Sequence, residues 1–154
     1  MLALVYEYRH LLGKCTAGVG VTVAEIERLT RLEAMFEPGE DDRRARDGRR
    51  FRREPVHLDG VVRGGALHDA VTISELTLGG LVCVRAPWAE VGTVVDIAIT
   101  DGDAHRSYRF KGVVRSVVDD GDDYRLGIEL VGAPVMVRYA APQTIDPGLA
   151  KLAA

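Results

Sequence analysis

The sequence predicts a mainly β protein, a six- to seven-stranded antiparallel barrel that follows an N-terminal helical hairpin. From residue 55 onward, apolar and polar residues alternate with a period of two in six short runs. Turn-forming groups such as Gly64-Gly65 and Asp101-Gly102-Asp103 separate these runs. Before residue 37, apolar residues recur instead at helical spacing. Short strands at this spacing are typical of a small antiparallel barrel or sandwich, and we expect the barrel.

The N-terminal region predicts two helices that pack together. Gly13 to Gly20 interrupts the helical pattern, so we expect the first helix to end there. Thr22 and Glu25 form a capping-box sequence that opens the second helix. Two short helices are marginal alone, so the pair should dock on the barrel or on another subunit. The expected apolar stripes are Leu4, Val5, Tyr8, Leu11 and Leu12, and then Ile26, Leu29, Leu32, Met35 and Phe36.

The six runs and the turns between them define the expected domain organisation. The strands are expected near residues 55–64, 67–73, 81–84, 95–99, 108–115 and 124–130. The expected parts are a helical hairpin at residues 1–36, a charged linker at 37–48, a barrel domain at 49–140 and a C-terminal tail at 141–154. In the tail, Pro142, Pro147 and Gly148 limit any helix to a short one at Pro147–Leu152.

Composition excludes several classes of protein. The chain has 154 residues, 47% of them hydrophobic and 28% charged, which fits one folded globular domain. No apolar stretch approaches the roughly 18 residues of a membrane helix, and Glu7 and Arg9 interrupt the N-terminal apolar run, so no signal peptide is expected. Cys15 and Cys83 form neither a CxxC motif nor a disulfide framework. We therefore expect a cytoplasmic protein.

An arginine-rich segment stands out against the acidic chain. Residues 43–53 read RRARDGRRFRR and carry a local charge of +6, although the whole chain has a net charge of −3 and its remainder carries −9. Such a segment predicts one local binding site for an anion rather than an extended surface that binds polyanions. All seven cations are Arg, whose planar fork grips phosphate with two hydrogen bonds and stacks on flat rings.

Two short motifs are spaced so that they can form one site. Arg49 to Arg53, called the arginine strap below, reads R-x-x-x-R and precedes the first strand. Glu75-Leu76-Thr77-Leu78-Gly79-Gly80 ends the second strand and begins the third. The interval from Arg53 to Glu75 is 22 residues, which one hairpin can span. An antiparallel hairpin would then place the strap beside a barrel wall that carries a carboxylate and a hydroxyl.

These residues resemble the PilZ family, bacterial receptors for cyclic di-GMP. That family carries R-x-x-x-R before its barrel and [D/N]-x-S-x-x-G on it. The resemblance covers roughly residues 49 to 131, including the stretch Gly112 to Arg115 and the closing Leu126 to Leu130. It implies a PilZ-like barrel that binds cyclic di-GMP without catalysing a reaction and that needs no cofactor.

The resemblance assigns a role to each motif residue. Arg49 and Arg53 match the arginines that clamp phosphates and guanine faces. Glu75 stands where the family has Asp or Asn, and its carboxylate can still accept from the N1–H and N2–H edge of guanine. Thr77 keeps the hydroxyl of the family's Ser but adds a methyl group, and the carboxylate of Glu75 lies one methylene further out. Because both substitutions change the geometry of the site, we expect weaker binding than in a consensus member. Gly79-Gly80 lets the backbone approach a base or adopt a positive φ. The expected ligand-binding residues are Arg49, Arg50, Arg53, Glu75, Thr77, Gly79 and Gly80.

Two other functions remain as alternatives. A degenerate PilZ-like protein would bind no nucleotide and act as a protein-interaction module. An RNA- or DNA-binding barrel with an arginine arm ranks below it, because the chain lacks the interleaved exposed aromatic residues of such platforms. We also expect an unidentified protein partner, or self-association, through the N-terminal helices. Ligand that orders the strap should move those helices, since only residues 37–48 separate the two parts.

Other residues that could carry chemistry are interpreted structurally. His57, His68 and His105 have no metal-ligand spacing, so they are expected on the surface. The acidic run at 119–123 lacks the twelve-residue pattern of a calcium loop and is expected to be a hairpin turn. Trp88 is expected to plug a barrel end. No nucleophile, base and orienting group can be assembled, so we expect no enzyme.

Overall fold

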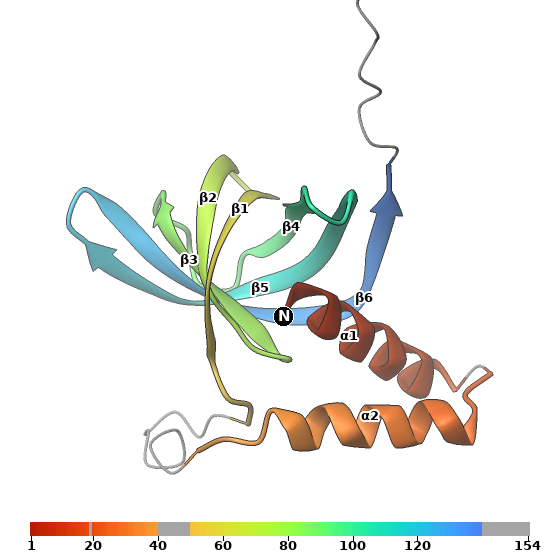
Figure 1. Cartoon of the computed structure of the whole chain (residues 1–154). Helices are drawn as coiled ribbons and strands as arrows, with labels where there is room; N and C mark the ends of the chain where they lie inside the picture. The colour runs from red at the N-terminus through yellow and green to blue at the C-terminus, as the bar shows by residue number, and fades with distance from the viewer. Residues whose placement is uncertain (19, 40–49, 140–154) are drawn as a thin grey trace, which may run out of the picture.

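The computed structural model describes residues 1–18, 20–39 and 50–139, and it confirms a mainly β barrel with two N-terminal helices (Figure 1). The expected short helix at Pro147–Leu152 and most of the linker lie outside the described residues. The helices are α1 (Leu2–Ala17) and α2 (Val23–Met35), and the strands are β1 (Glu54–Gly64), β2 (Leu67–Leu76), β3 (Gly80–Ala86), β4 (Val94–Asp101), β5 (Arg106–Asp120) and β6 (Asp123–Arg138).

The six strands of the described chain close into one antiparallel barrel. Their order around it is β1-β2-β3-β6-β5-β4, and β1 pairs with β4 to complete the circle. The closing register sets Gly60 opposite Ile99 and Val62 opposite Ile97. Closure removes the unpaired edges that an open sheet of this size would expose. β5 and β6 are the longest strands, and their hairpin projects beyond the barrel body (Figure 1).

The period-two pattern of the sequence places alternate side chains in the barrel core. Cys83 is fully buried there, and burial raises the pKa of its thiol to about 12, so this cysteine is an inert core residue at neutral pH. The buried barrel residues include Val62, Val71, Ile73, Leu81, Val95, Ile97, Ile99, Phe110, Val114, Leu126 and Ile128.

Helix α1 continues through Gly13, contrary to the expectation that it ends there. It ends at Ala17, and Gly18 follows with a left-handed φ of 67°, its N–H donating to the carbonyls of Lys14 and Cys15. A single glycine inside a helix costs about 1 kcal/mol, which packing can offset. At Gly13, a Cβ would lie 3.3 Å from the Cβ of Ala133, so the glycine lets α1 approach β6 closely.

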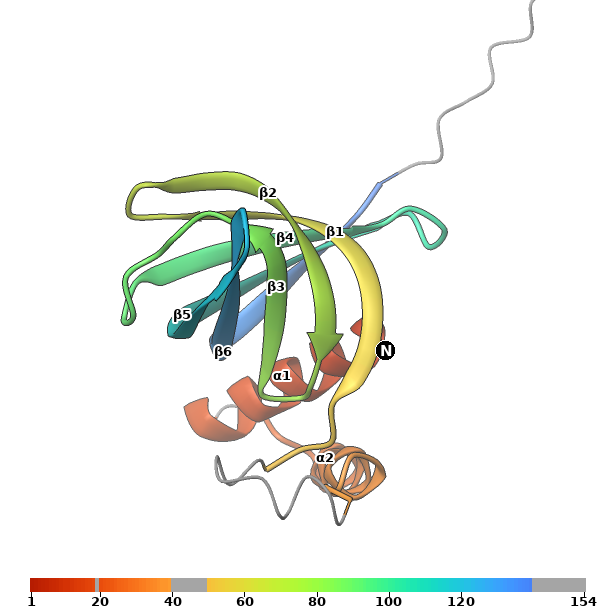
Figure 2. The same ribbon diagram turned by 90° about the vertical axis from the view of Figure 1, so that its left-hand side faces the viewer.

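Helix α2 begins as the sequence predicts but buries a narrower stripe. Both hydrogen bonds of the capping box between Thr22 and Glu25 are present. Leu32 is fully buried, whereas Ile26 and Met35 are 49% and 50% exposed, so the stripe predicted for α2 was too wide. The reason is the layer order, because α2 lies on the far side of α1 from the barrel and its outer face meets solvent (Figure 2).

Two ion pairs join the helices along the sides of their contact. Arg28 Nε donates to Glu7 Oε1 at 2.6 Å, and Lys14 Nζ donates to Glu25 Oε2 at 2.7 Å. The hydrogen bond from Arg28 holds the pKa of Glu7 below its ordinary value. These part-buried pairs lie beside solvent, so they set the register of the two helices and add little stability.

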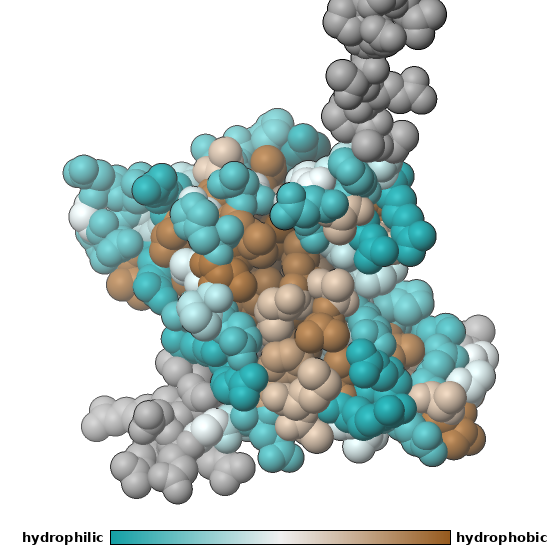
Figure 3. Space-filling model, viewed as in Figure 1, coloured by the Kyte–Doolittle hydropathy of each residue, from teal (hydrophilic) through white to brown (hydrophobic). Residues whose placement is uncertain are grey.

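The helical hairpin docks on the barrel, which is one of the two expected surfaces. Helix α1 lies across the lower end of the barrel in Figure 1, between the strands and α2. Its inward side chains Leu2, Val5, Tyr8 and Leu11 are buried and join the barrel residues in one hydrophobic cluster. The rings of Tyr6 and Tyr108 meet there at 5.5 Å. On the face shown in Figure 3, apolar side chains form a band that runs from the barrel down to the helices.

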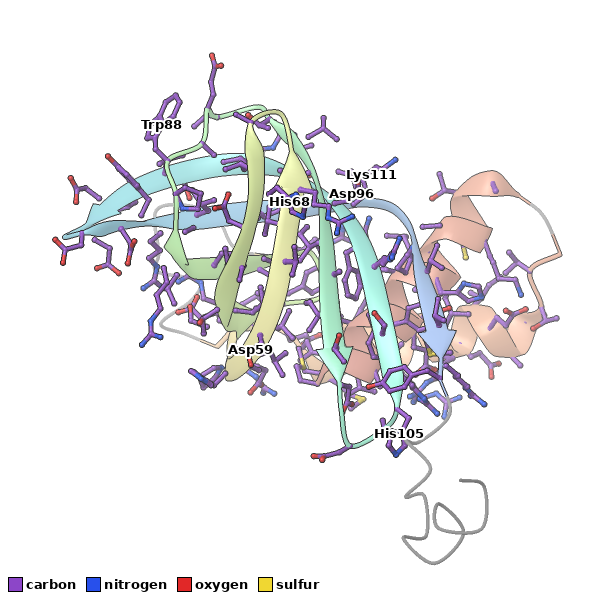
Figure 4. The ribbon with its side chains drawn as sticks, turned by 90° about the horizontal axis from the view of Figure 1, so that it is seen from above. Asp59, His68, Trp88, Asp96, His105 and Lys111 are labelled. Carbon is purple, nitrogen blue, oxygen red and sulfur yellow. The ribbon has the colours of Figure 1, made fainter. Side chains whose placement is uncertain are left out.

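Trp88 does not plug a barrel end, contrary to the expectation. Its side chain is 60% exposed and points away from the strands (Figure 4). The small residues Ala86 and Ala89 take the buried positions on either side of it.

The histidines lie where the sequence predicts them, outside the core. His68 and His105 lie far apart on the barrel (Figure 4). Within residues 1–18, 20–39 and 50–139, no group of His, Cys, Asp and Glu is arranged to hold a metal ion. In the same residues, neither helix has the length and apolar character needed to cross a membrane.

Candidate functional site

The β1–β2 hairpin brings the end of the arginine strap to the second motif. Pro55 pairs with Glu75 and Glu54 pairs with Leu76, so the start of β1 lies beside the end of β2. Arg53 Nη1 then donates to Glu75 Oε2 at 3.1 Å. Residues 22 positions apart in the sequence therefore form one site, as the hairpin argument expected. Arg49 lies outside the described residues, so the described strap is Arg50 to Arg53.

Glu75 is held between two arginines. Arg53 binds one carboxylate oxygen, and Arg125 Nη2 of β6 donates to the other at 3.2 Å. Arg125 was missed by the sequence analysis, although it stands directly before the Leu126 to Leu130 stretch on the polar phase of its strand. A ligand that uses Glu75 as an acceptor must share it with these guanidinium groups or displace one of them.

Thr77 closes the turn between β2 and β3. Its hydroxyl accepts from the N–H of Gly79 at 3.1 Å and of Gly80 at 2.8 Å, and it donates to the carbonyl of Gly80. The backbone N–H of Thr77 also donates to that carbonyl at 2.8 Å. The hydroxyl is thus saturated within its own turn. The hydroxyl thereby fixes the shape of the barrel wall at this turn.

The two glycines of the turn have different structural roles. Neither has a positive φ, so of the two alternatives expected for these glycines the left-handed conformation does not occur. At Gly80, a Cβ would lie 2.7 Å from the carbonyl oxygen of Ile128, which rules out a side chain without movement of β6. At Gly79, a Cβ would only touch the Phe51 ring at 3.5 Å. The Gly79 carbonyl accepts from Leu130 N–H at 2.9 Å, which fixes the turn to β6.

Phe51 anchors the strap to the helical hairpin. Its ring is buried and meets the ring of Tyr8 edge-on at 5.5 Å, while the Arg50 guanidinium lies 5.2 Å above it. On the next residue, the N–H of Arg52 donates to the carbonyl of Phe36 at 2.8 Å. The strap therefore contacts the helices before any ligand is bound.

Tyr8 of α1 connects α2 with the arginine strap. Its hydroxyl donates to Glu33 Oε1 of α2 at 3.0 Å, and Arg50 Nη2 reaches the same oxygen at 3.4 Å. Burial, followed by the hydrogen bond to Glu33, raises the pKa of Tyr8 to about 12. The phenol thus remains a donor at every physiological pH.

A cavity of about 690 Å³ opens between the strap, the β2–β3 turn and α1. Its size is within the range of small-molecule sites. The motif residues Arg50, Arg53, Glu75, Thr77, Gly79 and Gly80 all line it. Residues of α1, β5 and β6 also line the cavity, which the sequence alone did not indicate. These additional lining residues include Tyr8, Arg9, Leu12, Arg115, Ile128 and Glu129.

The described chain is a closed six-stranded barrel with a cavity lined by arginines. The family model of the PilZ domain matches residues 47–137, more than half of the chain, and the chain belongs to the PilZ domain family. PilZ domains are in general non-enzymatic binding modules, and the family comprises receptors for cyclic di-GMP.

One solved structure similar to this chain is that of the Bacillus subtilis inhibitor of motility (MotI/DgrA). The TM-score is 0.44 at 16% sequence identity, and the alignment covers 65% of this chain and 44% of that one. This chain thus matches less than half the length of the inhibitor. No curated protein matches the sequence.

The hydroxyl of Thr77 should be required for the turn. Thr77→Val keeps the shape of the side chain and removes the acceptor for two backbone N–H groups, so we expect a loss of about 1–3 kcal/mol in the free energy of unfolding. Thr77→Ser keeps the hydroxyl and should lose less than about 1 kcal/mol. Urea unfolding of both variants measures the difference. Equal stabilities of the Val and Ser variants would contradict this role.

Proposed function

We propose that this chain is a receptor for cyclic di-GMP and that the dinucleotide binds in the cavity between the arginine strap and the barrel. The observation that carries the proposal is the cavity of about 690 Å³ at the R-x-x-x-R and Glu75–Gly80 motifs of a PilZ domain. Four arginines from three parts of the fold line it: Arg9, Arg50, Arg53 and Arg115.

The chemistry of the cavity suits a dianion with two flat bases. Arginine binds phosphate through paired N–H groups and stacks on aromatic faces. Arg50 already stacks on a ring, that of Phe51, and its side chain remains 73% exposed at the cavity. Glu75 supplies an acceptor for the guanine edge, and a ligand phosphate competes with it for Arg53. This competition supports weaker binding than in a consensus site.

The same contacts favour the second candidate, a PilZ domain that binds partners without nucleotide. Glu75 is already bridged by Arg53 and Arg125, and the Thr77 hydroxyl is saturated by its turn. The ligand must therefore offset an existing ion-pair network. A direct binding measurement separates the two functions.

We further propose that ligand binding is transmitted to the helical hairpin, which contacts a protein partner or a second copy of the chain. Phe51 of the strap packs on Tyr8 of α1, and Arg52 is bonded to the end of α2. Displacement of the strap by a ligand thus changes contacts on both helices. We propose that the chain works in the cytoplasm as a signalling module.

The strap arginines should dominate affinity for cyclic di-GMP. Arg49→Ala and Arg53→Ala should each weaken binding at least about tenfold, because each removes a charged clamp. Arg43→Ala, Arg44→Ala and the exposed β1 residue in Arg63→Ala should change it less than about twofold. Isothermal titration measures the affinities, with GTP and a short single-stranded RNA as competitor controls. Equal losses in all five variants would contradict a specific site and indicate a diffuse basic patch.

Restoring the family pattern should tighten binding. Glu75→Asp with Thr77→Ser shortens the carboxylate, which then reaches Arg53 and Arg125 less well, and keeps the hydroxyl of the turn. We expect an affinity gain of about tenfold over the natural chain. Binding that appears only in the double variant supports the second candidate. Absence of binding in both folded proteins would refute the receptor function.

Hydrogen exchange should show whether binding reaches the helices. With cyclic di-GMP, protection should rise in residues 43–53 and change in residues 22–36, because Phe51 and Arg52 join the two regions. Phe51→Ala removes the packing on Tyr8 and should abolish the change in the helix. Protection confined to the strap and to residues 75–80 would reject this output and leave the hairpin as a static element.

A further inference from the structure

The α1 wall of the cavity carries an arginine that neither motif contains. Arg9 lines the cavity together with its neighbours Tyr8 and Leu12. Its Nη2 donates to the carbonyl of Gly132 at 3.3 Å. Its Nε is buried and has no hydrogen-bond partner among the described residues. A buried donor without a partner is unfavourable, so the described residues satisfy this guanidinium poorly.

The other arginines of the cavity each contact a carboxylate. Arg53 is paired with Glu75 at 3.1 Å, Arg115 with Glu129 at 2.8 Å and Arg50 with Glu33 at 3.4 Å. In the described part of the chain, Arg9 forms no ion pair of this kind. Burial lowers its pKa, an effect that the nearby Glu129 partly offsets, and a guanidinium nevertheless stays charged at neutral pH. The cavity thus holds a partly buried cation without a paired anion.

We propose that Arg9 is a ligand-binding residue that contacts a phosphate of the nucleotide in this cavity. The inference rests on the proposed function of the cavity and extends the site from the barrel and strap to the helical hairpin. A phosphate offers several acceptors and a charge, and it would satisfy the fork of Arg9 without breaking an existing ion pair. Bound ligand would then bridge α1 to the barrel wall.

Substitutions at Arg9 test whether this side chain binds the ligand. Arg9→Met keeps the aliphatic stem and removes the charge together with the unpartnered donor. We expect it to weaken cyclic di-GMP binding at least about tenfold while the urea midpoint stays the same or rises. Arg9→Lys keeps the charge without the fork and should bind with intermediate affinity. Arg109→Met, at an exposed position of β5 that does not line this cavity, is the matched control and should change affinity less than about twofold.

The possible results separate the two proposals. Binding by the natural chain that is unchanged in Arg9→Met overturns the role of Arg9 and leaves the receptor function intact. Absence of binding by the natural chain overturns both. A loss of affinity that matches the unfolded fraction of Arg9→Met, with full recovery in Arg9→Lys, assigns Arg9 to folding only and overturns its role in binding.

Discussion

Tyr8 is the contact on which the arrangement of this molecule depends. Its side chain is 1% exposed, its hydroxyl bonds to Glu33 of α2, and its ring packs on Phe51 of the strap. It also lines the cavity beside the barrel wall. One aromatic residue therefore connects both helices, the strap and the site. Aromatic side chains with a polar end suit such junctions, because the ring is buried while the hydroxyl finds a partner.

The positive charge of the site comes from the arginines that line one cavity. Among the described residues, each guanidinium that lines the cavity is paired with a carboxylate, except that of Arg9. This matching offsets the local excess of positive charge around the cavity. An anionic ligand at the proposed site would compete with these ion pairs at the strap and barrel, and in the described part of the site it would meet an unpaired guanidinium only at Arg9. Glu75, with two arginine partners, is where this competition is strongest.

Residues of the Glu75–Gly80 motif stabilise the turn between β2 and β3 as well as lining the cavity. The Thr77 hydroxyl and the missing side chain of Gly80 are both explained by the turn and its contact with β6. A pattern associated with ligand binding can thus also be a requirement of the barrel. Glu75 differs, because its carboxylate lies on the cavity and bonds to groups that a ligand would meet. The hydroxyl of Thr77 is therefore held within its own turn, whereas the carboxylate of Glu75 lies between two arginines.

The sequence by itself determined the barrel, the capping box of α2 and the meeting of Arg53 with Glu75. These features depend on local periodicity, turn residues and the length of one hairpin, all of which can be read along the chain. Only the tertiary structure decided that α1 passes Gly13, that Ile26 and Met35 face solvent, and that Trp88 lies outside the barrel. It also brought Arg9 to the cavity and Arg125 to Glu75, from positions 44 residues before and 72 residues after Arg53. Contacts of this kind depend on how the helices seat on the closed barrel, and no local pattern encodes that docking.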